Sequence, residues 1–147
     1  MTETANERIR IEAAADRCWD VAIDFESYPE WVRDVKDVHI LERDDQGRGR
    51  RVEFRAAALG KSIRYVLEYD YSEAPSAFSW KFAEGDMLRR LDGTYRFEPD
   101  CPASTRVHYE PAVELAVPLP GLVKRRAAGL IRGSALKELK KQVEAVA

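Results

Sequence analysis

The chain has 147 residues, a net charge of −2, 45% hydrophobic residues and 34% charged residues. This length is typical of one domain with its own core, and so small a net charge does not favour binding to DNA. The N-terminal sequence lacks the apolar core of a secretory signal, and no apolar run approaches the roughly 18 residues of a transmembrane helix. We therefore expect a single cytoplasmic domain over residues 1–147, without a transmembrane segment.

The first elements predicted are a short strand and a helix. Ile9 and Ile11 alternate with charged residues between Glu7 and Glu12, which indicates a half-buried strand. A helix is predicted to follow from about Ala14 to Asp24.

An aromatic segment, WDVAIDFESYPEW, spans Trp19 to Trp31 and also contains Phe25 and Tyr28. Each buried aromatic side chain hides roughly 150–250 Å² from water, so a concave surface elsewhere in the protein must receive these rings. Pro29 fixes the turn that delivers Trp31. We expect Trp31 to lie at or near the rim of a pocket.

Alternating apolar and polar residues then predict a series of strands joined by short turns. The predicted strands span Val35–Arg43, Arg51–Ala58, Ile63–Tyr71, Phe78–Ala83, Arg90–Glu98 and Ser104–Ala116. The mixed phase of the first of these indicates a bulge or a bend. Strands linked by short turns are antiparallel neighbours, and here one face is apolar and aromatic while the other is charged. This pattern is typical of an α+β domain whose sheet curls around something on one side.

The last predicted element is a helix that begins near Leu122. It would contain roughly 25 residues and extend about 38 Å, enough to cross the concave face of the sheet. Gly129 and Gly133 lie inside it and would either leave room for a ligand or allow close packing. Its basic residues, between Lys124 and Lys141, fit either a solvated face or a surface for RNA or an anionic membrane.

Four segments of the sequence resemble a known family: IDFESYPEWV, LDGTYRFEP, STRVHYE and PLPGLVKRR. They are similar to the START-like (SRPBCC) helix-grip superfamily, in its bacterial polyketide cyclase/dehydrase and coenzyme Q-binding branch. The resemblance implies a curved antiparallel sheet wrapped around a long C-terminal helix, with two short helices after the first strand. It also implies a hollow between the sheet and that helix. Members include lipid carriers, polyketide cyclases and ribosome-directed proteins, so the fold does not select the chemistry.

The strand alternation, taken with this resemblance, predicts which residues line the hollow. From the residues alone, the same inward side chains could equally fill a solid core. The expected ligand-binding residues are Phe25, Tyr28, Trp31, Phe54, Tyr65, Leu67, Tyr69, Trp80, Phe82, Leu91, Tyr95, Tyr109, Leu122, Arg126 and Leu130.

No motif identifies catalytic residues. Tyr65, Tyr95 and Arg89 are the candidates for acid–base work, because a cyclase needs a polar group inside its pocket. Arg89 is expected on the same strand face as Leu91. Arg89 also fits an exposed position at a strand end. The two histidines and two cysteines do not have the spacing of metal ligands. We expect neither a metal nor a cofactor.

Three functions remain open at this stage. The first is binding or transport of a small hydrophobic molecule (aromatic, polyketide or isoprenoid-like) by a non-enzymatic monomer or weak homodimer. The second is a polyketide aromatase/cyclase or dehydratase that uses pocket tyrosine or arginine groups. The third is an interaction module whose basic C-terminal helix contacts the ribosome or a membrane surface. Two or more convergent polar groups in a pocket would favour the enzyme, and a wholly apolar pocket would favour the carrier. A collapsed pocket with a continuous basic face would favour the interaction module.

Overall fold

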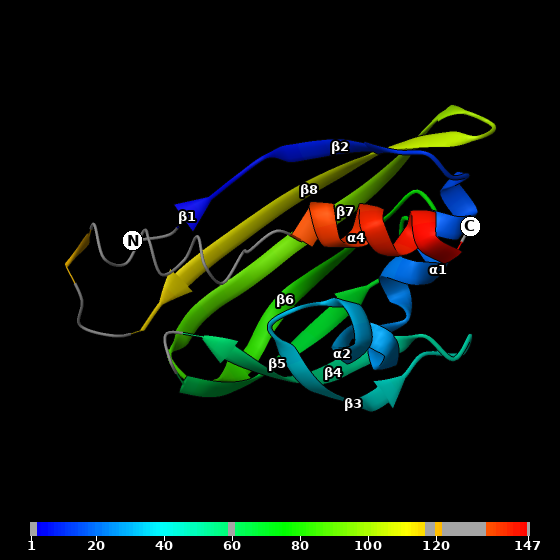
Figure 1. Ribbon diagram of the computed structural model, residues 1–147. Helices are drawn as coiled ribbons and strands as arrows, with labels where there is room; N and C mark the ends of the chain where they lie inside the picture. Colours follow the sequence, from blue (N-terminus) through cyan, green and yellow to red (C-terminus); the bar gives the residue numbers. More distant parts are fainter. Residues whose placement is uncertain (1–2, 59–60, 117–119, 122–134, 147) are drawn as a thin grey trace.

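The computed structural model describes residues 3–58, 61–116, 120–121 and 135–146, which form one curved antiparallel sheet with helices on one side (Figure 1). The elements are β1 (Glu3–Thr4), β2 (Glu7–Ile11), α1 (Ala15–Ile23), a 3-10 turn η1 (Phe25–Ser27), α2 (Tyr28–Trp31), β3 (Val35–Arg43), β4 (Gly49–Ala58), β5 (Lys61–Asp70), β6 (Ala77–Gly85), β7 (Leu88–Cys101), β8 (Ser104–Leu115) and α4 (Ala135–Val146).

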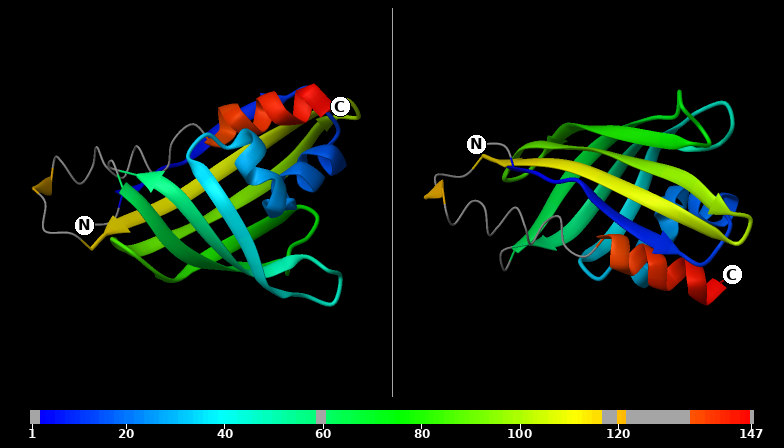
Figure 2. Two further views of the ribbon diagram at one scale, coloured as in Figure 1. Left: turned by 60° about the horizontal axis from the view of Figure 1, so that its bottom comes forward. Right: turned by 90° about the horizontal axis from the view of Figure 1, so that it is seen from above.

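The sheet follows the chain from hairpin to hairpin. Its strand order is β1-β8-β7-β6-β5-β4-β3, and β2 also pairs with β8. Both β1 and β2 run antiparallel to β8, so the start of the chain lies beside the last strand. Figure 2 shows the sheet curving around α1, α2 and α4. The predicted α+β helix-grip architecture is confirmed.

The concave face receives the aromatic segment, as its ring content predicts. Trp19 of α1 packs edge-on against Phe78 and Phe97, with ring centroids 5.5 and 5.8 Å apart. Phe25 of η1 is completely buried. The helices and the sheet therefore share one apolar core, which fixes α1 and α2 against the strands that position the site.

Helix α4 packs on the protein through an apolar stripe. Leu136, Leu139 and Val143 are all buried, at the spacing of successive helical turns. The predicted C-terminal helix is confirmed over Ala135–Val146. The residues predicted for its first part, Leu122, Arg126, Gly129, Leu130 and Gly133, lie outside the described residues.

Polar contacts hold α4 against β2. The Lys140 Nζ donates a hydrogen bond to the carbonyl oxygen of Arg10 at 2.8 Å. The Glu144 carboxylate accepts the backbone N–H of Glu12 at 2.9 Å and also binds Lys140 at 2.6 Å. These contacts fix the position of the helix along the strand.

Two strands depart from regular alternation. The register of β3 against β4 shifts at three points between Val35 and Arg43, which confirms the predicted irregularity. A further shift, between Leu88 and Arg90 of β7, was not predicted. It allows Leu88 and Leu91 both to be buried. Arg89 was expected on the face of Leu91, but its side chain is exposed and lies 3.4 Å from Glu114.

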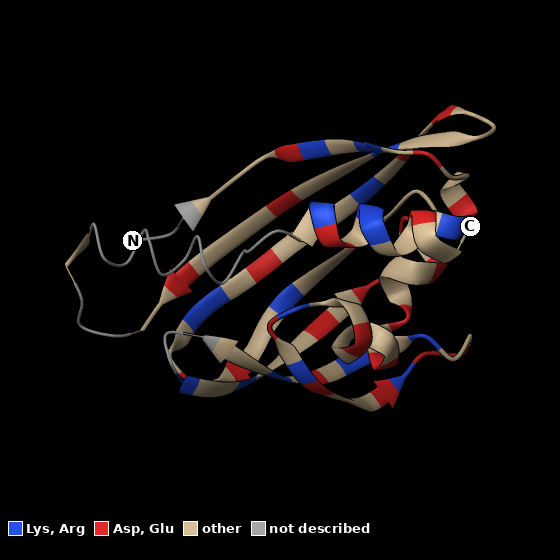
Figure 3. Ribbon diagram, viewed as in Figure 1, with Lys and Arg blue, Asp and Glu red and all other residues tan. Residues whose placement is uncertain are grey.

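The convex face of the sheet carries ion pairs. Arg64 contacts Glu53 at 2.7 Å and Glu84 at 3.2 Å, and Arg51 contacts Glu68 at 2.5 Å. Acidic and basic residues alternate over the strands and over α4 (Figure 3). No helix in the described part of the chain is both long enough and apolar enough to cross a bilayer.

Candidate functional site: a pocket between the sheet and the C-terminal helix

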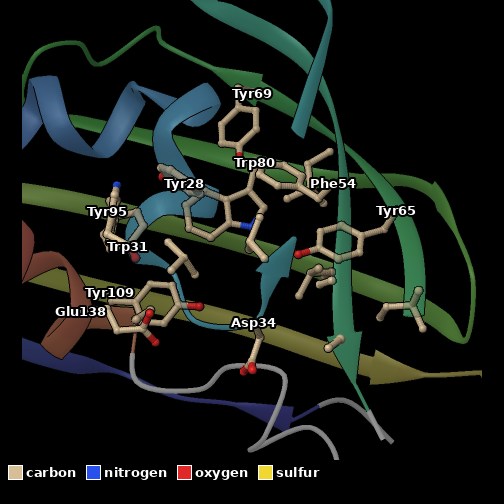
Figure 4. A pocket seen from close by; sticks show the side chains of 18 of the residues that line it. Tyr28, Trp31, Asp34, Phe54, Tyr65, Tyr69, Trp80, Tyr95, Tyr109 and Glu138 are labelled. Carbon is tan, nitrogen blue, oxygen red and sulfur yellow. The ribbon is translucent and has the colours of Figure 1, made fainter. Parts of the chain in front are cut away.

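A pocket of about 150 Å³ lies between the concave face of the sheet, α2 and α4 (Figure 4). Strands β4 to β8 supply most of its wall, and α2, the connection from α2 to β3, the first residue of β3, and α4 supply the rest. The lining residues are Tyr28, Trp31, Val32, Asp34, Val35, Phe54, Ala56, Ala57, Ile63, Tyr65, Leu67, Tyr69, Phe78, Trp80, Leu91, Tyr95, Tyr109, Ala135 and Glu138.

The structure brings most of the predicted ligand-binding residues together in this pocket. Those that line it are Tyr28, Trp31, Phe54, Tyr65, Leu67, Tyr69, Trp80, Leu91, Tyr95 and Tyr109. That these residues contact a ligand stays a prediction.

Three predicted residues that the structure describes are not part of the lining, and Leu122, Arg126 and Leu130 lie outside the described residues. Phe25 lies behind it, with its ring centroid 5.4 Å from that of Tyr28 and 4.4 Å from that of Tyr69. Phe82 packs against the core without facing the pocket. Arg89 lies on the surface, because the register shift between Leu88 and Arg90 turns its side chain away from the face of Leu91. Strand alternation therefore gave the observed face for most strand positions, while Phe82 of β6 is absent from the lining.

Stacked rings form the aromatic wall. Tyr65 stacks on Phe54, with centroids 5.4 Å apart and planes 20° apart. Tyr95 stacks on Tyr109 at 4.9 Å and 20°. Trp80 of β6 has its ring centroid 5.4 Å from that of Tyr95 of β7. Such pairs stabilise the protein beyond the area they bury and hold the rings in fixed orientations.

The hydroxyl groups of the tyrosines fall into two sets. The Tyr28 hydroxyl donates to the carbonyl oxygen of Ala22, and the Tyr71 hydroxyl, outside the lining, donates to that of Gly49 at 2.6 Å. The hydroxyls of Tyr65, Tyr69 and Tyr95 make no hydrogen bond within the described part of the chain. Polar groups inside proteins are normally paired, so these three are available to a molecule in the pocket.

Burial sets the protonation state of the same three tyrosines. It raises the pKa of Tyr65, Tyr69 and Tyr95 well above that of a free phenol, and the negative charge of Asp34 raises the pKa of Tyr65 further. At neutral pH these hydroxyls are therefore uncharged. They can donate hydrogen bonds to a ligand but cannot act as bases.

Two carboxylates also line the pocket, and sequence analysis found neither. The Asp34 side chain is 49% exposed, which places it at the mouth of the pocket. The Glu138 carboxylate accepts the backbone N–H of Arg33 at 2.7 Å and so ties α4 to the connection after α2. Two sequence features could have pointed to these carboxylates: Asp34 follows Trp31 closely, and Glu138 precedes Leu139 of the apolar helical stripe.

The charged lining of the described wall is acidic only. Among the described residues that line the pocket there is no lysine, arginine or histidine. The described residues also contain no group of three or more histidine, cysteine, aspartate or glutamate side chains that could hold a metal ion. The arrangement can therefore enclose an aromatic molecule, donate hydrogen bonds to it from neutral phenols, and place a carboxylate beside it.

A curved sheet wrapped around a C-terminal helix, with an aromatic pocket between them, defines a helix-grip fold. A family model described as polyketide cyclase / dehydrase and lipid transport matches residues 2–144. The chain belongs to this family. No curated protein sequence gives a significant match.

Solved structures share the fold over nearly the whole chain. A START superfamily protein from Mycobacterium smegmatis is 24% identical with a TM-score of 0.89, and the match covers 98% of this chain and 99% of that one. The Zhui aromatase/cyclase from Streptomyces sp. is 14% identical with a TM-score of 0.85, and the match covers 98% and 94%. A protein from Thermus thermophilus is 25% identical with a TM-score of 0.84, and the match covers 99% of both chains. These similarities confirm the START-like fold.

Proposed function

We propose that this protein binds a small hydrophobic molecule containing an aromatic ring in the pocket between the sheet and α4. The observation that carries the proposal is a pocket with aromatic walls inside an otherwise packed core. Ala56, Ala57 and Ala135 lie among its lining residues, where larger side chains would fill the space. Concave, mostly apolar sites with a few placed polar groups are typical of small-molecule binding.

The size of the pocket favours a compact ligand. An apolar cavity of about 150 Å³ accepts a guest the size of benzene, and this pocket has about that volume. We therefore favour an aromatic ligand over an extended isoprenoid or fatty-acid chain.

The proposal is tested by searching for the ligand and then measuring its effect on stability. Mass spectrometry under native conditions should detect a small molecule that is carried through purification. A ligand present at a hundredfold excess over its dissociation constant should add about 2.7 kcal/mol to the free energy of unfolding. For a domain of this size, the melting temperature should then rise by about 5–10 °C.

A variant with a filled pocket provides the control. Ala56 is buried in the lining, so Ala56→Leu should occupy the space and abolish the melting shift while the protein still folds. Circular dichroism and the melting curve without ligand would verify folding. A broad panel of quinones, flat aromatics, polyketide mimics and fatty acids that never shifts the melting temperature would contradict the proposal.

A second candidate function is that of a polyketide aromatase/cyclase or dehydratase. It is supported by the convergence of the Tyr65 hydroxyl and the Asp34 carboxylate on one pocket, and by the solved neighbour described as an aromatase/cyclase. A carboxylate can remove a proton next to a carbonyl, and a neutral phenol can donate a hydrogen bond to the enolate oxygen that forms.

Turnover separates the two candidates. If the protein is a cyclase, wild type should convert a short poly-β-ketone mimic to an aromatic product, and Asp34→Asn should reduce the rate while retaining binding. If wild type binds the mimic without converting it, the carrier function is favoured and the cyclase is excluded for that substrate.

A further inference from the structure

We propose that the pocket selects uncharged single-ring aromatic molecules that carry a carbonyl oxygen, and that the Tyr65 hydroxyl donates the hydrogen bond that recognises this oxygen. The inference rests on the proposed function, because it names the class of molecule that the same pocket takes.

Tyr65 is held in place by the sheet. It pairs directly with Phe54 in the register of β4 and β5, and the two rings stack. Figure 4 shows its hydroxyl directed toward the middle of the pocket. The ring is therefore oriented before any ligand arrives, which reduces the entropy lost on binding.

The Tyr65 hydroxyl can donate a hydrogen bond to a ligand, whereas the hydroxyls of Tyr28 and Tyr71 already donate to backbone carbonyl oxygens. Those two hydroxyls donate to the carbonyl oxygens of Ala22 and Gly49. Tyr65 makes no such bond within the described part of the chain. A ligand that covers the Tyr65 hydroxyl without accepting its hydrogen bond removes that donor from water and leaves it unpaired, which costs affinity.

The protonation state of Tyr65 allows it to act as a hydrogen-bond donor. Burial, and then the negative charge of Asp34, raise its pKa, so the phenol stays protonated. A protonated phenol is a good partner for a carbonyl oxygen, which only accepts hydrogen bonds.

The charge of the described wall favours an uncharged ligand. Asp34 and Glu138 are both among the lining residues, and the described lining contains no basic side chain. The described cation beside Asp34 is Arg33, which lies outside the lining with its Nε 3.9 Å from the Asp34 carboxylate. A carboxylate on the ligand would therefore lie beside two carboxylates with no basic side chain in the described lining, which is unfavourable where water is partly excluded.

The experiment compares two probes of nearly the same shape, acetophenone and α-methylstyrene, in which a C=O group is exchanged for C=CH₂. Dissociation constants are measured by calorimetry for the wild type, Tyr65→Phe and the control Tyr71→Phe, which removes a hydroxyl outside the pocket. The readout is how each substitution changes the ratio of the two constants. This change is independent of the different solubilities of the probes, because each free probe is the same in every titration.

Tyr65→Phe should weaken acetophenone binding by about five- to tenfold, the usual value of one hydrogen bond, and leave α-methylstyrene binding unchanged or slightly tighter. Tyr71→Phe should leave the ratio at its wild-type value. Equal weakening of both probes by Tyr65→Phe would overturn the inference. The assignment to Tyr65 would be overturned if Tyr69→Phe or Tyr95→Phe removed the preference for acetophenone while Tyr65→Phe kept the wild-type ratio of the two dissociation constants. Melting curves would establish that each variant is folded.

Benzamide and benzoate test the charge selection, since they have nearly the same shape but differ by one negative charge. Benzoate should bind about tenfold or more weakly than benzamide, and equal or tighter binding of benzoate would overturn the restriction to uncharged ligands. If all four probes fail while a larger ligand binds, the single-ring class is wrong and the proposed function stands. If the broad ligand panel fails as well, the proposed function itself is wrong.

Discussion

Gly93 determines how closely Trp80 can pack against β7. The two residues are partners in the register of β6 and β7, and a Cβ atom at position 93 would lie 2.4 Å from Cζ2 of Trp80. Trp80 is 8% exposed and is confined by Phe78 and Tyr95, whose ring centroids lie 5.9 and 5.4 Å from its own. The indole ring therefore has little room to retreat except into the pocket.

We expect Gly93→Ala to push Trp80 toward the pocket and to lower the free energy of unfolding by about 1–3 kcal/mol, as other overpacking substitutions do. Urea denaturation followed by tryptophan fluorescence would measure both effects. Gly121→Ala is the control, because no atom of the described residues lies within 4 Å of a Cβ at that position. If Gly93→Ala keeps wild-type stability and emission, the close contact does not limit the packing of Trp80.

The buried tyrosines should make the protein sensitive to alkaline pH. Burial raises the pKa of Tyr28, Tyr65, Tyr69 and Tyr95 above the usual value of about 10. The folded state holds these protons more tightly than the unfolded state, so their stabilising effect is complete below about pH 10 and is lost as the pH rises toward the folded-state pKa. We expect tyrosinate absorbance and loss of near-ultraviolet circular dichroism to appear together. Complete ionisation of the tyrosines in a protein that is still native would contradict this.

For single residues, the sequence predicts the direction of a strand side chain but not whether that side chain borders a cavity. Tyr65, Trp80 and Tyr95 were predicted to face the C-terminal helix, and they line the pocket together with Ala135 and Glu138 of α4. Side-chain direction follows directly from the two-residue repeat of a strand. The same repeat does not reveal whether a buried ring borders a cavity or lies behind another ring. Phe25, which lies in η1 and not on a strand, is packed behind the rings of Tyr28 and Tyr69, and that depth was not visible in the sequence.

Strand β7 shows why an element can be predicted while its phase is not. The alternation that begins at Leu91 is correct, but the register shift between Leu88 and Arg90 changes the face of the preceding residues. In β3, several apolar residues on both faces signalled an irregularity. In β7, consecutive arginines at positions 89 and 90 gave no such signal, since either one fits an exposed position. A bulge is set by local backbone pairing, which hydrophobic periodicity does not record.

The contacts that attach α4 to β2 should weaken as the solution becomes acidic. Hydrogen bonds from Lys140 and from the backbone N–H of Glu12 lower the pKa of Glu144. The folded state therefore binds this proton less tightly than the unfolded state does. The stabilisation is present above the unfolded-state pKa, about 4.3, and is lost as the pH falls through the folded-state pKa.

We expect Glu144→Gln to be less stable than wild type at neutral pH, with a difference that shrinks as the solution is acidified. Urea denaturation across the acidic range would measure it. Glu30→Gln serves as the control, because the Glu30 carboxylate makes no ion pair or hydrogen bond within the described part of the chain. A Glu144→Gln deficit that persisted unchanged at low pH would show that the carboxylate charge is not responsible.

At the scale of the whole molecule, the hollow was the feature that sequence patterns alone could not supply. Alternation places rings on one face of the sheet, but whether they fill the interior depends on how strongly the sheet curves and where α4 crosses it. Those quantities arise from long-range pairing, such as that of β1 and β2 with β8. The family resemblance supplied the expectation of a hollow, and the carboxylates of Asp34 and Glu138 reach it only because the connection after α2 and α4 meet there.

Backbone hydrogen exchange should differ between strands of the sheet, and a bound ligand should slow exchange in the segments that border the pocket. Strand β8 is paired on both sides, and Val107 and Val113 within it are completely buried. Strand β3 is an edge strand with three register shifts, and Leu41 within it is 47% exposed. Because local opening requires fewer broken contacts at an irregular edge, we expect backbone amides of β3 to exchange with solvent faster than those of β8.

Ligand binding should slow exchange most around residues 31–35 and 135–138, where the pocket lining meets α4. Hydrogen exchange followed by mass spectrometry would measure both patterns, with Ala56→Leu as the variant in which the ligand has no effect. Uniform slowing along the whole chain, with no added protection at those two segments, would place the ligand outside this pocket.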